Sequence, residues 1–336
     1  MYPGQGIGAI PLVLNDGSLA VMFETEVSVV PTLHPAPADD LAEPIPGVSK
    51  FVIATAPAAG SLPTGAPLAF LPPTSVAVND VNPPRQQRSC NGIQAAAVDQ
   101  RSGQIYIAWT DGRARSDGVN DVMLERSDDN GLTWTAPLRV NGGPTADYVD
   151  HWCGAVDVGP SGDVRVAYRA RRESATAKPD GSSFSDYVGT FYQESFDHGV
   201  TFTAPISVST VRSDMHFAAE SRKGAFLGDY QQVAAAGPYT YVVREEPVRV
   251  NAHEPATFPP RYHHQRTWVA VLGPRSAQGA VTPAKPGPSR TRVLGSKTTR
   301  SLKHLAATGV SDGRLGLLFL LAALALVLAR RTRAGV

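Results

Sequence analysis

The chain has 336 residues, enough for one large domain or two ordinary ones. Hydrophobic residues make up 42% of it, and 31 Gly with 28 Pro favour many short strands joined by turns over long helices. A formal net charge of +1, without any run of mixed basic and aromatic residues, argues against nucleic acid as a partner.

The predicted elements repeat one pattern along the chain: two strands joined by a tight turn, then a third and a fourth strand. The first group is incomplete, because its end has become a stretch rich in Pro, Ala and Gly. The last group offers three strands. The predicted strands are 8–14, 19–23 and 51–54; 95–99, 105–109, 121–126 and 138–140; 154–158, 164–168, 188–194 and 206–208; then 231–236, 239–243 and 267–272.

Two segments are near-copies of one another. Residues 127–137 and 195–205 both read Ser-x-Asp-x-Gly-x-Thr-(Trp/Phe)-Thr-Ala-Pro. An Asp followed two positions later by Gly suits a tight turn, because the carboxylate accepts backbone N–H groups and Gly adopts positive φ. A recurring unit of this kind is typical of a repeat architecture.

The repeated segments resemble the Asp box, the neuraminidase repeat of sialidases and related six-bladed β-propellers. The resemblance implies an all-β, sialidase-like propeller over residues 1–272, with about four blades present. It places each repeat in the turn between the third and fourth strands of a blade, on the face away from the active site. Four blades do not close a six-bladed ring, and no signal peptide is visible at Met1, so we expect a chain truncated at its N-terminus.

The composition changes after Leu272. Residues 273–304 are rich in Pro, Gly, Ser, Lys and Arg and predict a disordered linker. Residues 315–329 form an apolar run of about 22 Å as a helix, short of the roughly 30 Å hydrocarbon core. Arg330, Arg331 and Arg333 follow it.

Residues 305–336 resemble a cell-wall sorting signal of the Leu-Ala-x-Thr-Gly type. The resemblance implies that a sortase cuts between Thr308 and Gly309 and joins the chain to peptidoglycan. A plain C-terminal membrane helix over 315–329 is the alternative. Both predict an extracellular, cell-wall or membrane-anchored protein whose basic tail is cytoplasmic.

Charged residues gather where the resemblance places the mouth of the propeller. An Arg cluster suits a sugar bearing a carboxylate, because guanidinium binds carboxylate through two parallel hydrogen bonds. The candidate substrate-binding residues are Arg88, Arg113, Arg172, Arg244, Trp152 and Asp229.

Sialidases use a Tyr nucleophile activated by a Glu, an acid/base Asp and three Arg. The candidate catalytic residues are Tyr230, Glu245, Glu246 and Asp150. The family's Arg-Ile-Pro motif and a clear equivalent of its acid/base Asp are both absent, and Asp229 and Tyr230 also fit a structural role at the start of a strand. We therefore expect the chain as given to be inactive.

The sequence predicts neither a metal site nor a cofactor. His263 and His264 are adjacent, so on a strand they point to opposite faces. No P-loop, dinucleotide fingerprint, zinc pair or nucleophile elbow is present. Cys90 and Cys153 permit one disulfide, and two buried free thiols are an open alternative.

The resulting hypothesis is a surface-displayed propeller that acts on glycans or glycoproteins, by retaining hydrolysis of sialic-acid-like sugars in a full-length form. The alternatives are a non-catalytic adhesin or binding module, and a spacer in the envelope.

Overall fold

The computed structural model describes residues 6–26, 49–57, 59–81, 87–88, 90, 93–143, 149–172, 187–209, 213–221, 224–248 and 264–273. They form strands and two short 3₁₀ turns, so the predicted all-β class is confirmed. Within these ranges no helix is long and apolar enough to cross a membrane. The predicted linker, the sortase site at Thr308 and Gly309, and the apolar run 315–329 lie outside the described residues.

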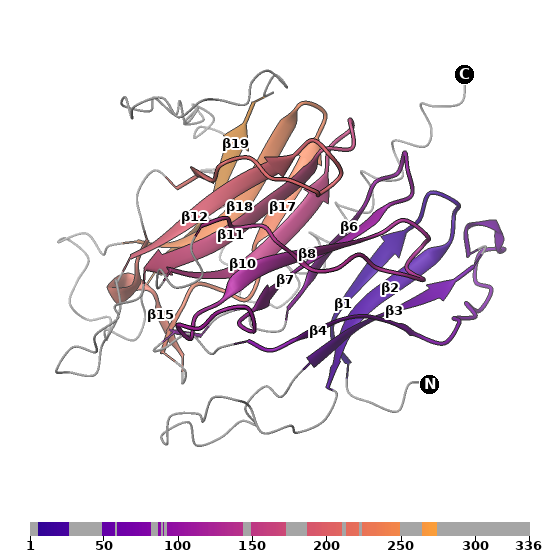
Figure 1. The fold of residues 1–336 in the computed structure, drawn as a ribbon, viewed down its shortest axis with the longest axis horizontal. Coiled ribbons are helices and arrows are strands. Elements are labelled where there is room, and N and C mark those ends of the chain that lie inside the picture. Colours follow the sequence, from indigo (N-terminus) through magenta and orange to yellow (C-terminus); the bar gives the residue numbers. More distant parts are fainter. Residues whose placement is uncertain are drawn as a thin grey trace, which may run out of the picture. The chain divides into compact units, whose positions relative to one another are not determined.

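Four antiparallel sheets follow one another along the chain (Figure 1). Sheet 1 has the order β1-β2-β3-β4, sheet 2 has β6-β7-β8-β9, and sheet 3 has β10-β11-β12-β13 with β14 also paired to β12. Sheet 4 has β17-β18-β19, and a small sheet joins β15, β16 and β5.

The bounds of the elements in the first two sheets and the connection between them are β1 Gly6–Val13, β2 Leu19–Glu26, β3 Ser49–Ala56, η1 Ala59–Ser61, β4 Thr74–Asn79, β5 Gln87–Arg88, β6 Ala95–Val98, β7 Ile105–Asp111, β8 Asp121–Ser127 and β9 Leu138–Arg139. The remaining elements are β10 Val149–Val158, β11 Val164–Arg172, β12 Tyr187–Ser195, β13 Ile206–Ser207, β14 Ser213–Asp214, η2 Met215–Phe217, β15 Ala219–Ser221, β16 Gly224–Phe226, β17 Gln232–Ala236, β18 Tyr239–Val248 and β19 His264–Leu272.

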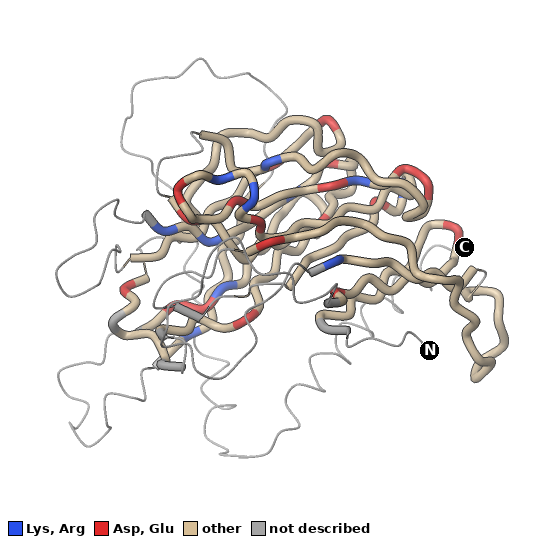
Figure 2. Tube along the Cα trace, turned by 60° about the horizontal axis from the view of Figure 1, so that its bottom comes forward, with Lys and Arg blue, Asp and Glu red and all other residues tan. Residues whose placement is uncertain are grey.

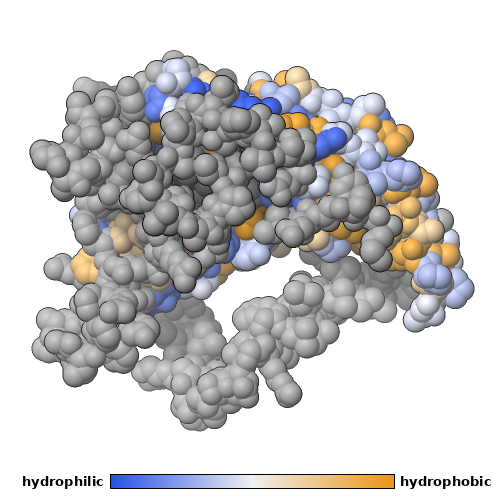
Figure 3. Space-filling view, turned by 90° about the horizontal axis from the view of Figure 1, so that it is seen from below, coloured by the Kyte–Doolittle hydropathy of each residue, from blue (hydrophilic) through white to orange (hydrophobic). Residues whose placement is uncertain are grey.

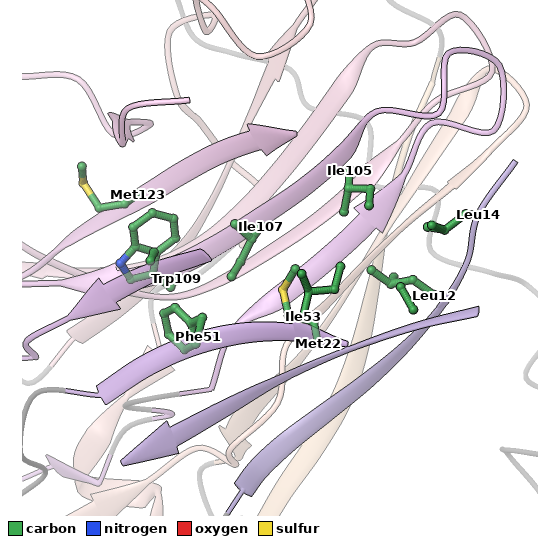
Figure 4. Close-up of a cluster of buried hydrophobic side chains, with 11 residues drawn as sticks. Leu12, Leu14, Met22, Phe51, Ile53, Ile105, Ile107, Trp109 and Met123 are labelled. Carbon is green, nitrogen blue, oxygen red and sulfur yellow. The ribbon is translucent and has the colours of Figure 1, made fainter. Parts of the chain in front are cut away.

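The inner sheets are buried on both faces, which explains their nearly continuous apolar strands. Side chains alternate across β7: Ile105, Ile107 and Trp109 join one core cluster, whereas Tyr106 and Ala108 join another. The first cluster also contains side chains from β1, β2 and β3, so it is the core between sheets 1 and 2. Figure 4 shows these side chains converging, and Phe51 meets Trp109 edge-on with ring centroids 6.0 Å apart.

The same packing recurs between the later sheets. Tyr106 and Leu124 of sheet 2 pack with Val166 and Tyr168 of sheet 3. On the other face of sheet 3, Tyr192 packs with residues of β17 and β18. Each sheet therefore stacks face to face on the next, as the predicted propeller requires. The number of blades stays a prediction.

The two repeated turns have matching hydrogen bonds. The Ser127 hydroxyl donates to Asp129 at 2.8 Å and accepts the Gly131 N–H at 2.8 Å. Asp129 also accepts from the Thr133 N–H at 2.8 Å and its hydroxyl at 2.6 Å. Residues 195–201 repeat all four bonds. Both turns connect the third strand of a sheet to the fourth, as expected from the sequence.

Each repeated turn also packs against the preceding sheet. A Cβ on Gly131, which has φ of +88°, would lie 3.0 Å from Ile53 of β3. A Cβ on Gly199 would lie 3.0 Å from Leu124 of β8. Gly is therefore needed at these positions for both backbone conformation and space.

The strands differ from the predictions mainly at one end. β10, β11 and β18 extend through the charged residues near 150, 170 and 245, which the sequence placed in strand starts and loops. Ion pairs and neighbouring sheets compensate for burying these polar groups. The fourth strand of sheet 1, β4, was not predicted, because the Pro-rich stretch before it hides its pattern. That stretch, residues 62–71, carries exposed Leu and Phe side chains at the right-hand end of Figure 3.

Candidate functional site

The sheets have two chemically different ends. At the turn end, Ile105 pairs with Ser127 and Val164 with Ser195, next to the repeated turns. At the opposite end, Asp111 pairs with Asp121, and Asp150 pairs with Arg171. We call this opposite end the charged end; it comprises residues 111–121, 149–152, 169–171, 227–230 and 244–246. Figure 2 shows basic and acidic residues interspersed on the left of the tube, whereas the turns on the right are mostly acidic.

A buried guanidinium organises the part of the charged end between sheets 3 and 4. Arg169 on β11 is only 1% exposed. It donates to the carbonyls of Leu227 and Gly228 at 3.3 and 3.2 Å and pairs with Glu245 of β18 at 3.2 Å. Burial lowers the pKa of Arg169 to about 10, although the Glu245 carboxylate opposes that shift. The side chain therefore stays charged at neutral pH.

We call Arg169 with its partners Leu227, Gly228 and Glu245 the Arg169 clamp. It fixes the backbone immediately before Tyr230. Gly228 has φ of +96°, and a Cβ there would lie 3.5 Å from Glu245. Two residues further on, the Tyr230 side chain is 65% exposed. The structure thus places Glu245 of β18 beside the loop that carries Tyr230, while Glu246 binds Arg244 with Nη2 and Oε1 2.7 Å apart.

The predicted acid/base residue lies deeper. Asp150 is 1% exposed and accepts two hydrogen bonds of 2.9 Å from Asn120, one from the backbone N–H and one from the side-chain amide. Burial raises the pKa of Asp150, and Arg171 and Asn120 oppose the shift. Asp150 lies beside the 112–120 connection, at the junction of sheets 2 and 3.

A polar network continues from Asp150 into sheet 2. Arg115 pairs with Asp117 at 2.7 Å and with Asp121 at 3.3 Å. Asn141 donates to Asp121 at 2.7 Å and contacts Nδ1 of His151 at 3.1 Å. Burial raises the pKa of Asp121, and the amide of Asn141 and the two nearby Arg side chains counteract it. This network rigidifies the charged end rather than offering open groups.

The other predicted residues lie at separate points of the charged end. Arg113 pairs with Asp111 at 2.6 Å and is 44% exposed. Trp152 is fully buried, with the Arg171 guanidinium 5.9 Å from its ring centre. Arg172 ends β11 and Arg88 lies in β5, but their side chains are outside the described set.

Cys90 and Cys153 form a disulfide, which decides between the two alternatives that the sequence left open. The bond joins the segment before sheet 2 to the inner strand of sheet 3, beside Trp152 and Leu227 in one small core. Arg169 lies next to it, with Nη1 3.8 Å from Cys153 Sγ. The disulfide therefore supports the same loop as the Arg169 clamp.

In the described ranges no group of His, Cys, Asp and Glu side chains has metal-binding geometry. His264 begins β19, and His263 lies outside those ranges. The site residues predicted from the sequence do not include Arg169, Arg115 or His151. An Arg alternating with apolar residues inside a strand, as Arg169 does, indicates a buried guanidinium but does not identify its partners.

No family model and no curated protein matches the chain. Among solved structures, a Hadza microbial sialidase, Hz136, aligns at 17% identity and a TM-score of 0.39, covering 70% of this chain and 41% of its own. A protein of unknown function from Dyadobacter fermentans aligns at 17% identity and a TM-score of 0.40. The alignment covers 73% of this chain and 58% of that protein. A polysaccharide lyase of family PL25, an ulvan lyase, aligns at 12% identity and a TM-score of 0.43. The alignment covers 81% of this chain and 58% of the lyase.

The chain thus spans about half the length of these three structures. With identities and TM-scores this low, none of the likenesses assigns a role to a residue.

Proposed function

We propose that the charged end recognises acidic glycans, with Tyr230 as the aromatic contact for the sugar. The observation that carries this proposal is the Arg169 clamp, which holds a largely exposed Tyr230 on a fixed backbone. A rigid loop that presents an aromatic ring loses little entropy when a ligand binds. The ring offers an apolar face together with a polar hydroxyl, which suits a sugar.

The guanidinium groups of the charged end favour an acidic ligand over a neutral one. Arg113, at the sheet 2 part of this end, is 44% exposed, whereas Arg171 is buried beside the ring of Trp152. Guanidinium groups bind carboxylates bidentately. Arg113 and Arg244 already pair with carboxylates of the chain, so an acidic sugar would share or displace those partners.

The test is binding of a sialylated oligosaccharide and its neutral counterpart, measured by titration calorimetry on the whole chain. We expect preference for the sialylated ligand and at least about tenfold weaker binding by Tyr230→Ala, the loss of one anchoring aromatic. Tyr239→Ala is the matched control, because Tyr239 is 44% exposed at the turn end. Equal binding by Tyr230→Ala and the native chain would refute the role of Tyr230.

Retaining hydrolysis is the second candidate, favoured by Glu245 beside the Tyr230 loop. In this reaction Glu245 takes the phenol proton, and Tyr230 Oη attacks the anomeric carbon. The aglycone leaves with a proton from Asp150. Asp150 then takes a proton from the water whose oxygen attacks the anomeric carbon, and Glu245 returns its proton to the departing Tyr230 phenolate. The burial of Asp150 makes this candidate second to binding. A fluorogenic sialoside separates them: turnover that Tyr230→Phe abolishes while glycan binding persists would establish hydrolysis.

Display on the cell surface belongs to the same proposal and rests on the sequence of residues 305–336. Mass spectrometry of the chain from its native envelope should find Thr308 as the last residue, linked to peptidoglycan. An intact C-terminus in the membrane fraction would instead support the plain membrane helix.

A further inference from the structure

The outer edge of sheet 4 differs from the outer edges of sheets 2 and 3. β19 pairs with β18 along its whole length, and no described strand pairs with its other edge (Figure 1). By contrast, β8 pairs with β9, and β12 pairs with β13 and β14. The residues of β8 and β12 are mostly buried, whereas the four consecutive residues 266–269 of β19 are exposed.

Apart from the charge of Arg266, the β19 edge lacks the features that usually prevent strands from pairing. It runs nine residues without Pro or Lys, and its register with β18 contains no bulge. Trp268, Val269 and Val271 are 45%, 50% and 46% exposed. Soluble proteins normally protect such edges with charges, Pro, bulges or short strands. β9 and β13, with two residues each, illustrate the short-strand device.

We infer that β19 pairs antiparallel with β19 of a second copy of this chain, joining two three-stranded sheets across a two-fold axis. Pairing centred on Trp268 places Arg266 opposite Ala270 and Thr267 opposite Val269. The single charged residue of the strand therefore faces no like charge, and Trp268 faces its own counterpart. The partner is a second copy because this strand is complementary to itself in that register. A two-fold contact closes as a dimer because it pairs the β19 edge of each copy with that of the other.

The two faces of the joined sheet support this register. Val269 and Val271 would lie beside Thr267 and Gln265 of the partner on one face, and Trp268 beside Trp268 on the other, since paired residues share a face. Exposed apolar area is then removed from water on both faces at the same time. The inference is independent of glycan binding.

The experiment is sedimentation velocity of the full chain over a concentration series, with Trp268→Lys and Trp268→Glu as variants. The two-fold register puts like charges directly opposite in either variant, so each should associate at least about tenfold more weakly. Mixing the two variants should restore a dimer of one copy of each, because the charges are then opposite. Tyr239→Lys changes a similarly exposed aromatic away from the edge and should leave the dimer intact.

Circular dichroism of each variant checks that the sheets remain folded, and the mixing experiment tests the register itself. A native chain that is monomeric at every concentration would overturn the inference. In monomers, resistance to hydrogen exchange at the β19 amides that point away from β18 would show that the chain's own segment covers β19. Dimers of Trp268→Lys as strong as the native dimer would place the interface elsewhere.

Discussion

Arg169 of β11 and Glu245 of β18 form an ion pair with Nη2 and Oε2 3.2 Å apart, and the same guanidinium binds two carbonyls of the loop that leads to Tyr230. One side chain therefore connects sheet 3, sheet 4 and the loop between them. The candidate site has its shape because this charge is buried among partners on β18 and on the loop before Tyr230.

Replacing Arg169 with Met should destabilise the fold by about 3–5 kcal/mol, since the change removes three interactions of a buried charge. Amides of residues 227–230 should exchange faster in the variant. Arg113→Met, at a guanidinium that is 44% exposed, should cost about 1 kcal/mol or less. Urea unfolding of both variants measures these losses in the free energy of unfolding. Equal losses for Arg169→Met and Arg113→Met would contradict the structural role given to Arg169.

The Asp of each repeated turn should matter far more than its neighbour. Asp129→Ala and Asp197→Ala each remove acceptors for three hydrogen bonds and should cost about 1–3 kcal/mol. Asp128→Ala, adjacent to Asp129 but with a side chain that is 53% exposed, should cost about 0.5 kcal/mol or less. Thermal unfolding compares them; a cost at Asp128 as large as at Asp129 would be inconsistent with the hydrogen bonds described.

Acid should weaken the second repeated turn. Burial alone raises the pKa of Asp197, but hydrogen bonds from Thr201 and Ser195 outweigh it and lower the pKa to about 2 from 3.8. The stabilisation is therefore present above pH 3.8 and is lost as the pH falls towards 2. NMR titration of the Asp197 carboxyl measures this, and a midpoint at 3.8 would disprove it.

Glu125 should make the fold less stable as the pH rises. Its carboxyl is 4% exposed in β8, and burial raises its pKa to about 7 from 4.5, with Arg113 opposing the shift. The folded chain keeps the proton between those values while the unfolded chain releases it. The free energy of unfolding of the Glu125→Gln variant should therefore exceed that of the native chain by up to about 3 kcal/mol at pH 8 and by little at pH 4. A difference independent of pH would show that folding does not shift the pKa of Glu125.

The Cys90–Cys153 disulfide should stabilise the chain by about 4 kcal/mol, because it closes a loop with a separation of 63 residues. Reductant should lower the unfolding midpoint of the native chain and leave that of the Cys90→Ser, Cys153→Ser double variant unchanged. The opposite pattern, a native midpoint insensitive to complete reduction, would mean that the bond contributes no stability.

Local patterns were sufficient to predict most strands of the fold. The mainly apolar runs 105–109 and 164–168, each following a tight turn, predicted β7 and β11. The repeated turns were predictable because Ser, Asp, Gly and Thr make all their hydrogen bonds within a few residues. β4 escaped prediction, since its partner strand β3 is distant and the Pro-rich segment before it carries no strand pattern.

The site was only partly predictable for the same reason. The sequence by itself determined the all-β class, the repeated turns and the presence of Tyr230, Glu245 and several Arg near one another in the strand order. Only the tertiary structure decided that Arg169 is the buried clamp, that Glu245 rather than Glu246 lies beside the Tyr230 loop, and that the two Cys are bonded. Each of these depends on which side chains meet across neighbouring sheets, and such contacts between distant residues leave no periodic signal in the chain.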